Sequence, residues 1–469
     1  MYIAAFLAVC IAPTALLPIV GSDENSENRE LSEMPSFVED GHVNSNWGNE
    51  FETYFSEHFA LRGKLVTLDS LIKSSVFKTS SNEKVTVGKN GWLYFSETLP
   101  DYTGQGRMSD RRVHNTAKTL QLLREHFESD GRQFLFICAP NKNTLYPENM
   151  PSRFIRSSEP TNLDRLTGLL GQYSVDSISI AEVFGEYDRP LYLQRDSHWT
   201  NEGAAIAFNA AADSLGWEHI DYTEYPHSVE RVWHGDLDGM LFPSYERLSD
   251  QVVYDVDAGF EYAGSFLDED DLLIKTANKN GSGRLLMYRD SFGRAFYPIA
   301  AHSAEKAYFS RELPYKTALA DEVEADYVIL EVVERNLANI TSKAPFMNAP
   351  AREIDISASI EDGDNSCEYK IKGKSLKMWG VLDEKYFSDD SDILITLENE
   401  DGIYCWEPFP IYESSGDDAG SDENDIRQDY GFSLTIDKSE LPEGVYEVYG
   451  YIEKNGEYIC TQALAEVQI

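Results

Sequence analysis

An alternation of amphipathic helices with short apolar runs, between about residues 110 and 330, is the feature that most constrains the fold. The runs 134–137, 285–288 and 327–330 consist of aliphatic and aromatic residues without a charge. Strands of this composition belong in a sheet that helices cover on both faces. Apolar side chains at helical spacing accompany these runs over 110–129, 163–173 and 201–215. The alternation predicts an α/β fold over residues 47–348: a three-layer sandwich with a mainly parallel sheet.

The helical spacing ends near residue 348, and a second pattern follows. Short segments rich in β-branched and aromatic residues are separated there by Gly, Asp and Asn. They cover 354–360, 366–371, 393–397, 432–436, 446–453 and 458–467. This spacing predicts a small β-sandwich domain over residues 349–469, with acidic loops at 360–370 and 414–429.

The N-terminal part of the chain predicts a targeting segment and a linker. Residues 1–21 carry no charge and are rich in Ala, Leu, Ile and Val. Such a run predicts a transmembrane anchor or a signal segment, and both place the rest of the chain outside the cytoplasm. Residues 22–46 are polar and predict an extended linker. Helices with one wide apolar face are expected over 47–77, followed by a hairpin whose tight turn is Asn90-Gly91.

The composition excludes several classes of partner. With 40 basic against 81 acidic residues, the formal net charge is −41. Such a surface repels phosphate backbones, so nucleic acid is not expected as a partner. An anionic membrane surface held by basic patches is not expected either. The five cysteines have no metal-ligand spacing, and one disulfide among Cys367, Cys405 and Cys460 is an open alternative to free thiols.

Two motifs carry chemistry, and the first is Asp196-Ser197-His198-Trp199. An Asp and a His two residues apart on an extended loop can point to one site. The carboxylate can then accept the imidazole Nδ1–H, which leaves Nε2 free to act as a base. Thr200 is the expected N-cap of the helix that follows.

The second motif is the apolar strand 285–288, which runs through Arg289 and Asp290 into Ser291 and a predicted helix. A serine in this position lies at the carboxyl edge of the sheet, beside backbone N–H groups that can meet an oxyanion. Each motif alone has a commoner explanation: a surface Asp–His pair, or a serine that only caps a helix. Their combination predicts a nucleophile, Ser291, with His198 as base and Asp196 as its orienter.

At these residues the chain resembles the SGNH-hydrolase-like proteins of the alginate O-acetyltransferase group, including the DHHW proteins of Gram-positive bacteria. The resemblance covers roughly residues 30–337 and depends on the order and spacing of four motifs. They are Val87-Gly88-Lys89-Asn90-Gly91-Trp92-Leu93, Ala139-Pro140-Asn141-Lys142-Asn143-Thr144-Leu145-Tyr146-Pro147, Asp196-Ser197-His198-Trp199 and Arg289-Asp290-Ser291-Phe292. Two positions depart from the family pattern. Arg289 stands where ordinary SGNH hydrolases have Gly, and Ser197 occupies the second position of DHHW.

The resemblance implies a function as well as a fold. Members take acetyl groups from a membrane-bound O-acyltransferase and place them on an exported polysaccharide, so these two are the expected partners. The implied roles are nucleophile for Ser291, base for His198 and orienter for Asp196. Some members append a carbohydrate-binding β-domain, which residues 349–469 match in position. Neither a cofactor nor a metal is implied, and the sequence contains no dinucleotide or phosphate-binding motif.

Further candidates surround these motifs, each with a structural alternative. Arg335 and Asn336 follow the strand 327–330, where they could contact substrate or the oxyanion. Lys142 and Tyr146 could line the cleft, although Lys142 could instead hold a loop and Tyr146 could pack. Arg289 is a further candidate for substrate contact. Other residues with open roles are His302, expected to be structural, His234, a loop or cleft-edge residue, and the aromatics Trp379, Trp406 and Tyr412, which either stack on sugars or fill a core.

Three functions remain open on the sequence alone. The leading one is an O-acetyltransferase that uses Ser291, His198 and Asp196. An acetyl esterase would use the same residues with water as the acceptor. A non-catalytic polysaccharide-binding or scaffold protein is the alternative from another class, and it has no need of all three side chains.

Overall fold

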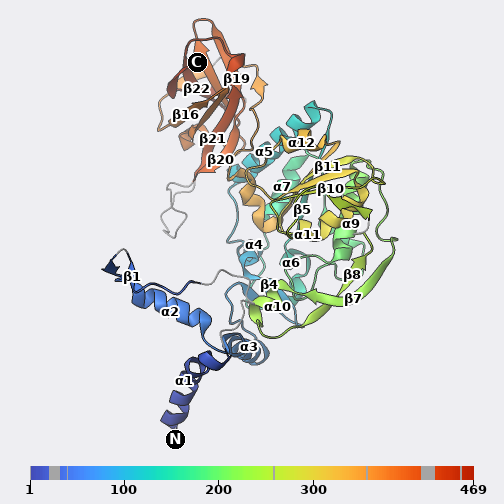
Figure 1. The fold of residues 1–469 in the computed structure, drawn as a ribbon. Helices are drawn as coiled ribbons and strands as arrows, with labels where there is room; N and C mark the ends of the chain where they lie inside the picture. The colour runs from blue at the N-terminus through green and yellow to red at the C-terminus, as the bar shows by residue number, and fades with distance from the viewer. Residues whose placement is uncertain are drawn as a thin grey trace.

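The computed structural model describes residues 2–20, 32–39, 41–256, 259–354, 358–413, 428–454 and 457–469 (Figure 1). A central sheet of seven strands organises the middle of the chain. In spatial order its strands are β6 (Ser177–Ile178), β5 (Gln133–Ala139), β13 (Tyr327–Val333), β11 (Arg284–Tyr288), β12 (Lys306–Ser310), β10 (Leu273–Ala277) and β9 (Glu261–Tyr262). All pairs from β6 to β12 are parallel, and β10 and β9 add an antiparallel edge. The predicted mainly parallel sheet is therefore confirmed.

Helices cover both faces of this sheet, as the apolar strands require. One face packs against α5 (Asp110–Ser129), α7 (Asn162–Leu170) and α12 (Leu319–Val323). The other packs against α8 (Ile180–Gly185), α9 (Asn201–Ser214) and α11 (Gly293–Ser303). Side chains along a strand alternate between the two cores, so Phe134 and Phe136 join the first while Leu135 and Ile137 join the second. The predicted three-layer sandwich is confirmed.

The N-terminal part contains α1 (Tyr2–Val20), α2 (Trp47–His58), α3 (Arg62–Ile72) and the π-helical turn η1 (Lys73–Phe77). Among the described residues, no helix has the length and apolar character needed to span a bilayer. Two residues each of β1 (Val38–Glu39) and β2 (His42–Val43) pair within the segment predicted as an extended linker, and that division of the chain stays a prediction. Residues 21–31 and 40 of this segment lie outside the described residues.

The hairpin predicted around Asn90-Gly91 is present as β3 (Val85–Val87) and β4 (Leu93–Phe95). Asn90 and Gly91 have φ values of 55° and 81°, in the left-handed region that such a turn requires. A second antiparallel pair consists of β7 (His227–His234) and β8 (Leu248–Tyr254), and the connection between them contains α10 (Asp236–Leu241). Short helical segments complete this part: η2 (Ser96–Thr98), α4 (Leu99–Thr103), α6 (Lys142–Leu145), η3 (Pro147–Asn149) and η5 (Glu334–Thr341).

The C-terminal region consists of two sheets that share one core. One sheet has the order β14 (Ala351–Arg352), β19 (Gly402–Trp406), β18 (Ile393–Asn399), β22 (Val445–Lys454), β23 (Glu457–Thr461) and β15 (Ala358–Glu361), with β24 (Ala465–Gln468) also paired to β22. The other has the order β16 (Ser366–Lys372), β17 (Ser375–Val381), β21 (Gln428–Asp437) and β20 (Phe409–Glu413); two short turns are η6 (Glu384–Tyr386) and η7 (Lys438–Glu440). Apolar side chains from both sheets meet between them, as in Leu376 and Leu434 against Ile395 and Val448. The predicted β-sandwich is confirmed.

The first acidic loop and the cysteines of this region are also described. Between β15, which ends at Glu361, and β16, which starts at Ser366, the acidic loop separates the two strands, as predicted. Cys367, Cys405 and Cys460 are all free thiols, so the open disulfide alternative is not realised. Of the other predicted acidic loop, residues 414–427 lie outside the described residues.

The sandwich is attached to the rest of the molecule through α5. Lys118, on α5, donates to Asp392 at 2.8 Å and pairs with Glu407 at 3.0 Å. Arg112 lies over the ring of Tyr412, 3.8 Å from its centroid. The division of the chain at residue 348 stays a prediction, although Met347 packs on the α5 core and Ala349 on the sandwich core.

Candidate active site

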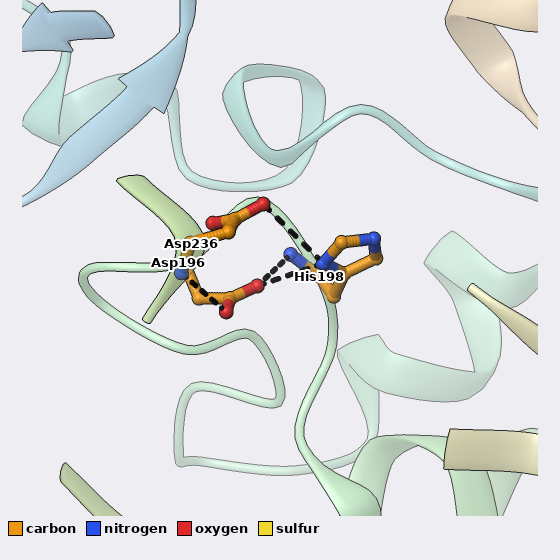
Figure 2. A group of neighbouring side chains, drawn as sticks. All are labelled: Asp196, His198 and Asp236. Atoms are coloured by element: carbon orange, nitrogen blue, oxygen red, sulfur yellow. Dashed lines mark hydrogen bonds and ion pairs between the residues drawn. The ribbon is translucent and has the colours of Figure 1, made fainter. Parts of the chain in front are cut away.

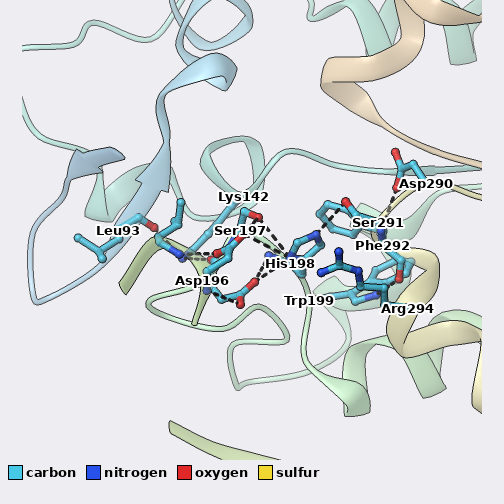
Figure 3. Close-up of polar contacts among 12 residues, drawn as sticks. Leu93, Lys142, Asp196, Ser197, His198, Trp199, Asp290, Ser291, Phe292 and Arg294 are labelled. Atoms are coloured by element: carbon cyan, nitrogen blue, oxygen red, sulfur yellow. Dashed lines mark hydrogen bonds and ion pairs between the residues drawn. The ribbon is translucent and has the colours of Figure 1, made fainter. Parts of the chain in front are cut away.

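A continuous chain of hydrogen bonds joins the three residues of the two predicted motifs. His198 Nε2 lies 2.9 Å from Ser291 Oγ, and His198 Nδ1 lies 2.8 Å from Asp196 Oδ1 (Figure 3). His198 and Ser291 are 93 positions apart in the sequence, and the fold brings them together at the carboxyl edge of the sheet. The arrangement suits proton transfer from Ser291 to His198, with the Asp196 carboxylate opposite the developing imidazolium.

Local interactions hold in place the two segments that form these hydrogen bonds, the loop with His198 and the turn with Ser291. Thr200 caps α9, as predicted, by accepting a hydrogen bond from Gly203 N at 2.9 Å. The buried indole of Trp199 donates from Nε1 to the carbonyl oxygen of Phe292 at 3.0 Å. This bond joins the loop that carries His198 to the turn that carries Ser291, which accounts for a tryptophan in the first motif.

The turn at Ser291 is held by the residue before it. Asp290 accepts hydrogen bonds from Phe292 N at 2.9 Å, from Val333 N at 2.8 Å and from Asn336 Nδ2 at 3.1 Å. The residue that caps α11 is Phe292, without a side-chain hydrogen bond, so Ser291 is not the helix cap. The hydroxyl of Ser291 is therefore left to His198.

Asp196 is buried, and both of its carboxylate oxygens accept hydrogen bonds within this site. Its Oδ1 also accepts from His198 N at 2.8 Å, and its Oδ2 accepts from Trp233 Nε1 at 2.9 Å and Asp236 N at 3.0 Å. Burial raises the pKa of Asp196, but the hydrogen bond and charge of His198, with the two other donors, outweigh burial and hold the pKa well below its usual value. Asp196 is thus an ionised, fixed hydrogen-bond acceptor.

His198 responds to the same carboxylate in the opposite sense. Burial lowers the pKa of His198, but the hydrogen bond to Asp196, its charge and the charge of Asp236 together raise the pKa above its usual value. A base with a raised pKa holds the serine proton more strongly once it has taken it.

Asp236 is the main site residue that the sequence did not reveal (Figure 2). Its carboxylate accepts from Ser197 N at 2.8 Å and from Ser197 Oγ, and its Oδ2 lies 3.6 Å from His198 Nδ1. Gly235 makes this approach feasible, because a Cβ there would lie 2.3 Å from the carbonyl oxygen of Arg195. In the sequence, Asp236 belongs to the run Trp233-His234-Gly235-Asp236. The histidine of this run is the obvious candidate for a site residue, and nothing in the pattern singles out Asp236.

Asp196, His198 and Asp236 also offer ligand atoms within 4.8 Å of one another, a spacing that a metal ion could use. Their polar atoms already serve each other and Ser197 as hydrogen-bond donors and acceptors. The donor set fits a histidine held by carboxylates better than it fits a cation site.

A cavity of about 580 Å³ opens at Ser291 and His198. One part of its wall is apolar and includes Trp199, Val253 and Ile299. Glu269 and Arg294 are the charged residues of the wall outside the Asp196–Asp236 cluster. His234 lines this cavity too, so of its two predicted roles the position at the cleft edge is the observed one.

Three predicted substrate or oxyanion residues lie near Ser291 without lining this cavity. Asn336 donates to Asp290 and so holds the turn. Arg335 lies over the ring of Phe292, 5.6 Å from its centroid, and remains half-buried beside the site. Arg289 is buried and donates to the carbonyl oxygen of Glu269 at 2.7 Å, which places it behind the cavity wall.

Lys142 holds a loop and Tyr146 packs against other residues, which are the structural roles considered for them from the sequence. Lys142 is buried and donates from Nζ to the carbonyl oxygens of Leu93, Gln194 and Asp196 at 2.7, 2.9 and 2.8 Å (Figure 3). Burial lowers the pKa of Lys142 to about 7. Tyr146 packs on Trp92 and accepts from Leu191 N at 2.8 Å. Neither side chain lines the cavity at Ser291.

The structure also describes the surroundings of the remaining candidate residues. His302 contacts the hydroxyls of Tyr222 and Tyr225 and is structural, as expected. Trp406 is a core residue of the sandwich, and Tyr412 lies under Arg112, so neither is available to stack on a sugar. Trp379 is half-buried on β17.

Replacement of Lys142 by Met should destabilise the fold, because the carbonyl oxygens of Leu93, Gln194 and Asp196 lose the Lys142 ammonium as a hydrogen-bond donor. We expect a loss of about 3 kcal/mol in the free energy of unfolding, measured by urea denaturation. Lys89→Met is the matched control, since Lys89 is exposed and donates to one surface carbonyl, and it should change stability by less than about 0.5 kcal/mol. Equal effects of the two replacements would show that the Lys142 contacts do not support the loop.

Comparison with known proteins gives a family match within the central part of the chain. Residues 85–241 match the family model described as "SGNH hydrolase-like domain, acetyltransferase AlgX". This range contains Asp196 and His198 and ends before Ser291. The predicted resemblance is confirmed for this part of the chain.

The individual proteins to which this chain is similar have low sequence identity to it. Two proteins described as "Probable alginate O-acetylase AlgJ" are similar: one from Pseudomonas fluorescens, 22% identical over 179 residues, and one from Pseudomonas syringae pv. tomato, 24% identical over 215 residues. The matches cover 37% and 44% of this chain, and 43% and 50% of those relatives, so the chain spans half or less of the curated relatives it matches. A solved DHHW family protein from Eubacterium siraeum is 16% identical, with a TM-score of 0.38, over 48% of this chain and 87% of that one.

Proposed function

From the match of residues 85–241 to the SGNH hydrolase-like acetyltransferase domain, we propose that this chain is an extracytoplasmic O-acetyltransferase acting on an exported polysaccharide. The observation that carries the proposal is the hydrogen-bond chain from Asp196 through His198 to Ser291 at the mouth of a cavity. A binding protein or scaffold has no need of a buried, ionised Asp196 behind a histidine that accepts from a serine. The two Pseudomonas relatives are described as probable alginate O-acetylases, which supports the same proposal.

The proposed reaction has two stages that share one base. Ser291 Oγ attacks the carbonyl carbon of an acetyl ester while His198 Nε2 takes the hydroxyl proton. The ester C–O bond then breaks, and the proton on His198 passes to the leaving oxygen, which leaves an acetyl group on Ser291. A sugar hydroxyl next gives its proton to His198 and attacks the acetyl carbon. The bond between that carbon and Ser291 Oγ then breaks, and His198 returns the proton to Ser291 Oγ. Asp196 holds the imidazole tautomer throughout and stays ionised.

The oxyanion of each stage forms beside the start of α11. No hydrogen bond among the described residues uses the backbone N–H of Ser291, whereas the N–H of Phe292 is taken by Asp290. We assign the Ser291 N–H as one oxyanion donor, since it lies beside the atom that reacts. Arg335, half-buried over the ring of Phe292, is a candidate for a second donor.

The remaining parts of the proposal concern partners. A membrane-bound O-acyltransferase would supply the acetyl group, and the C-terminal sandwich would hold the polysaccharide, with Trp379 as its one remaining aromatic candidate. In the cavity, the carboxylates of Asp196, Asp236 and Glu269 outnumber Arg294, which is itself bound to Asp270 at 2.9 Å. This balance favours a neutral sugar over a densely anionic one at the reacting hydroxyl.

Incubation with a chromogenic acetyl ester, with and without oligosaccharide, separates transferase from esterase. We expect acetylated oligosaccharide to form when a neutral acceptor is present, more of it than with a uronate oligosaccharide of equal length. Acetate as the sole product with every acceptor would establish the esterase instead. Failure to consume any ester would leave the scaffold function.

A further inference from the structure

Helix α3 turns its apolar side chains away from the protein. The residues it buries are Gly63, Thr67 and Ser70, which are small or polar. Apart from the half-buried Val66, the large apolar residues of α3 and η1 face solvent, with exposed fractions from 42% to 68%: Leu65, Leu68, Leu71, Ile72, Val76 and Phe77. Most of them recur at the helical spacing 65, 68, 72 and 76 and so form one stripe. An ordinary surface helix of a soluble domain has the opposite arrangement.

The same segment carries positive charge in a strongly acidic protein. Residues 61–78 contain four basic side chains and one acidic side chain, while the whole chain has a net charge of −41. A basic helix with an apolar face is typical of segments that lie on a membrane surface. The charge of this segment is therefore opposite in sign to the net charge of the chain, on which the expectation of no anionic membrane partner was based.

A cavity of about 580 Å³ lies at the end of the stripe. Its wall includes Ser74 and Ser75 of η1, together with three exposed cations, Lys78, Lys89 and Arg153. Arg153 Nη1 donates to the carbonyl oxygen of Lys78 at 3.0 Å, which fixes these two residues side by side. None of the three cations forms an ion pair within the described part of the chain, and no carboxylate lines the cavity. The one other charged lining residue, Arg195, is paired with Asp238.

We propose that the α3–η1 stripe and the adjoining cationic cavity form a docking surface for a membrane that contains anionic lipids. The stripe lies in the boundary between headgroups and acyl chains, and the cavity takes a lipid phosphate. Figure 1 shows α3 beside α1 and α2, at the opposite end of the molecule from the C-terminal sandwich. Docking here would direct the sandwich away from the bilayer.

A second copy of this chain fits the surface less well. In a two-fold contact across the stripe, the cations that flank it would face the same cations of the other copy. Repulsion between them opposes such a dimer, whereas anionic headgroups complement both the charge and the apolar stripe. The proposal is independent of the proposed acetyl transfer, and its test has no activity readout.

The test compares variants of the full chain on vesicles of phosphatidylcholine, with or without phosphatidylglycerol. Leu65→Ser combined with Leu68→Ser and Ile72→Ser removes the stripe. The second variant, Lys78→Gln with Lys89→Gln and Arg153→Gln, removes the cavity charge. All six residues are exposed, so folding should be kept, and circular dichroism checks this. Matched controls are Val229→Ser with Val232→Ser, exposed apolar residues on β7, and Lys84→Gln, an exposed lysine just before β3 and outside the cavity.

On vesicles with phosphatidylglycerol, we expect the stripe variant to bind at least about tenfold more weakly. The charge variant should lose roughly a hundredfold at low salt, about fivefold for each cation, and both controls should bind as the parent does. A photoactivatable lipid should label the peptide 64–78 in the parent protein, which separates this contact from any contribution of α1. Unchanged binding by the stripe variant, or cross-links from this peptide to a second protein copy in place of lipid, would overturn the proposal. Competition by inorganic phosphate without any lipid label would also overturn it.

Discussion

Replacement of Ser291 by Ala should reduce hydrolysis of an acetyl ester by at least about a thousandfold, because the attacking atom is lost. The fold should tolerate the change. The Ser291 hydroxyl makes its hydrogen bond to His198 and does not cap α11, so the cost is about 1 kcal/mol. Initial rates and thermal unfolding of the same preparations measure the two effects.

Ser228→Ala provides a matched control for that replacement. Ser228 is an exposed serine on β7 with a hydrogen bond to Glu230, and its loss should leave the rate unchanged. If the Ser291→Ala protein kept more than a tenth of the parent activity, Ser291 would have no place in the mechanism.

Asp196→Asn and His198→Ala should each lower turnover by at least about a hundredfold, and the double variant should be little worse than either one. A carboxamide in place of the Asp196 carboxylate would keep the shape but favour the wrong imidazole tautomer. The same change in the catalytic triad of a serine protease lowers turnover by about 10⁴. Single-turnover and steady-state rates of the three variants test the coupling.

A second Asp–His pair in the chain offers the control for these two residues. Asp213 lies 3.9 Å from His219 at the surface, so Asp213→Asn should leave the rate unchanged. Additive losses in the double variant of Asp196 and His198 would mean that the two residues act independently, and Asp196 would then not be the orienter.

The pH dependence follows from the raised pKa of His198. A base must be neutral to take the serine proton, so turnover should rise with pH through a midpoint above 6.5, the ordinary value for histidine. Asp196 is the main cause of the rise, so the residual activity of Asp196→Asn should have its midpoint at lower pH. If the midpoint were the same in Asp196→Asn as in the parent protein, a group other than the Asp196–His198 pair would control the rise of turnover with pH.

The α/β part of the fold was accessible from the sequence because its signals are local. The runs 134–137, 285–288 and 327–330 are apolar on both sides, and α5 begins and ends at the predicted residues. The strands β10 and β12 and the β7–β8 hairpin have no comparable signal. Their side chains alternate or face solvent, so their pairing depends on neighbours that are distant in sequence.

The site was accessible for a related reason. Asp196, His198 and Ser291 each lie in a local context, a loop before a capped helix or a strand running into a helix, that predicts their position at the sheet edge. Asp236 and Trp233 reach Asp196 only because Gly235 packs against Arg195 across the fold, and no spacing reports that contact. Arg289 stays an untested candidate for substrate contact; it does not line the cavity at Ser291, and a sequence does not say to which side of a turn a long side chain points.

The helix α3 illustrates the limit of periodicity. Its leucines recur at helical spacing and predict one wide apolar face. The spacing is present, but the face that packs on the protein is the one with Gly63, Thr67 and Ser70. Periodicity identifies a stripe, and tertiary contacts such as the bond from Ser244 N to Thr67 Oγ1 decide which side of the helix is inside.

The most direct measurement of the central claim is mass spectrometry of the protein quenched within milliseconds to seconds of mixing with an acetyl ester. The account predicts a mass increase of one acetyl group in the peptide that contains Ser291, accumulating in His198→Ala if deacylation is slowed more than acylation. Addition of an oligosaccharide to the parent protein should remove the label and yield acetylated sugar. Turnover of the ester with the label on another residue, or label on Ser291 that no acceptor discharges, would contradict the account.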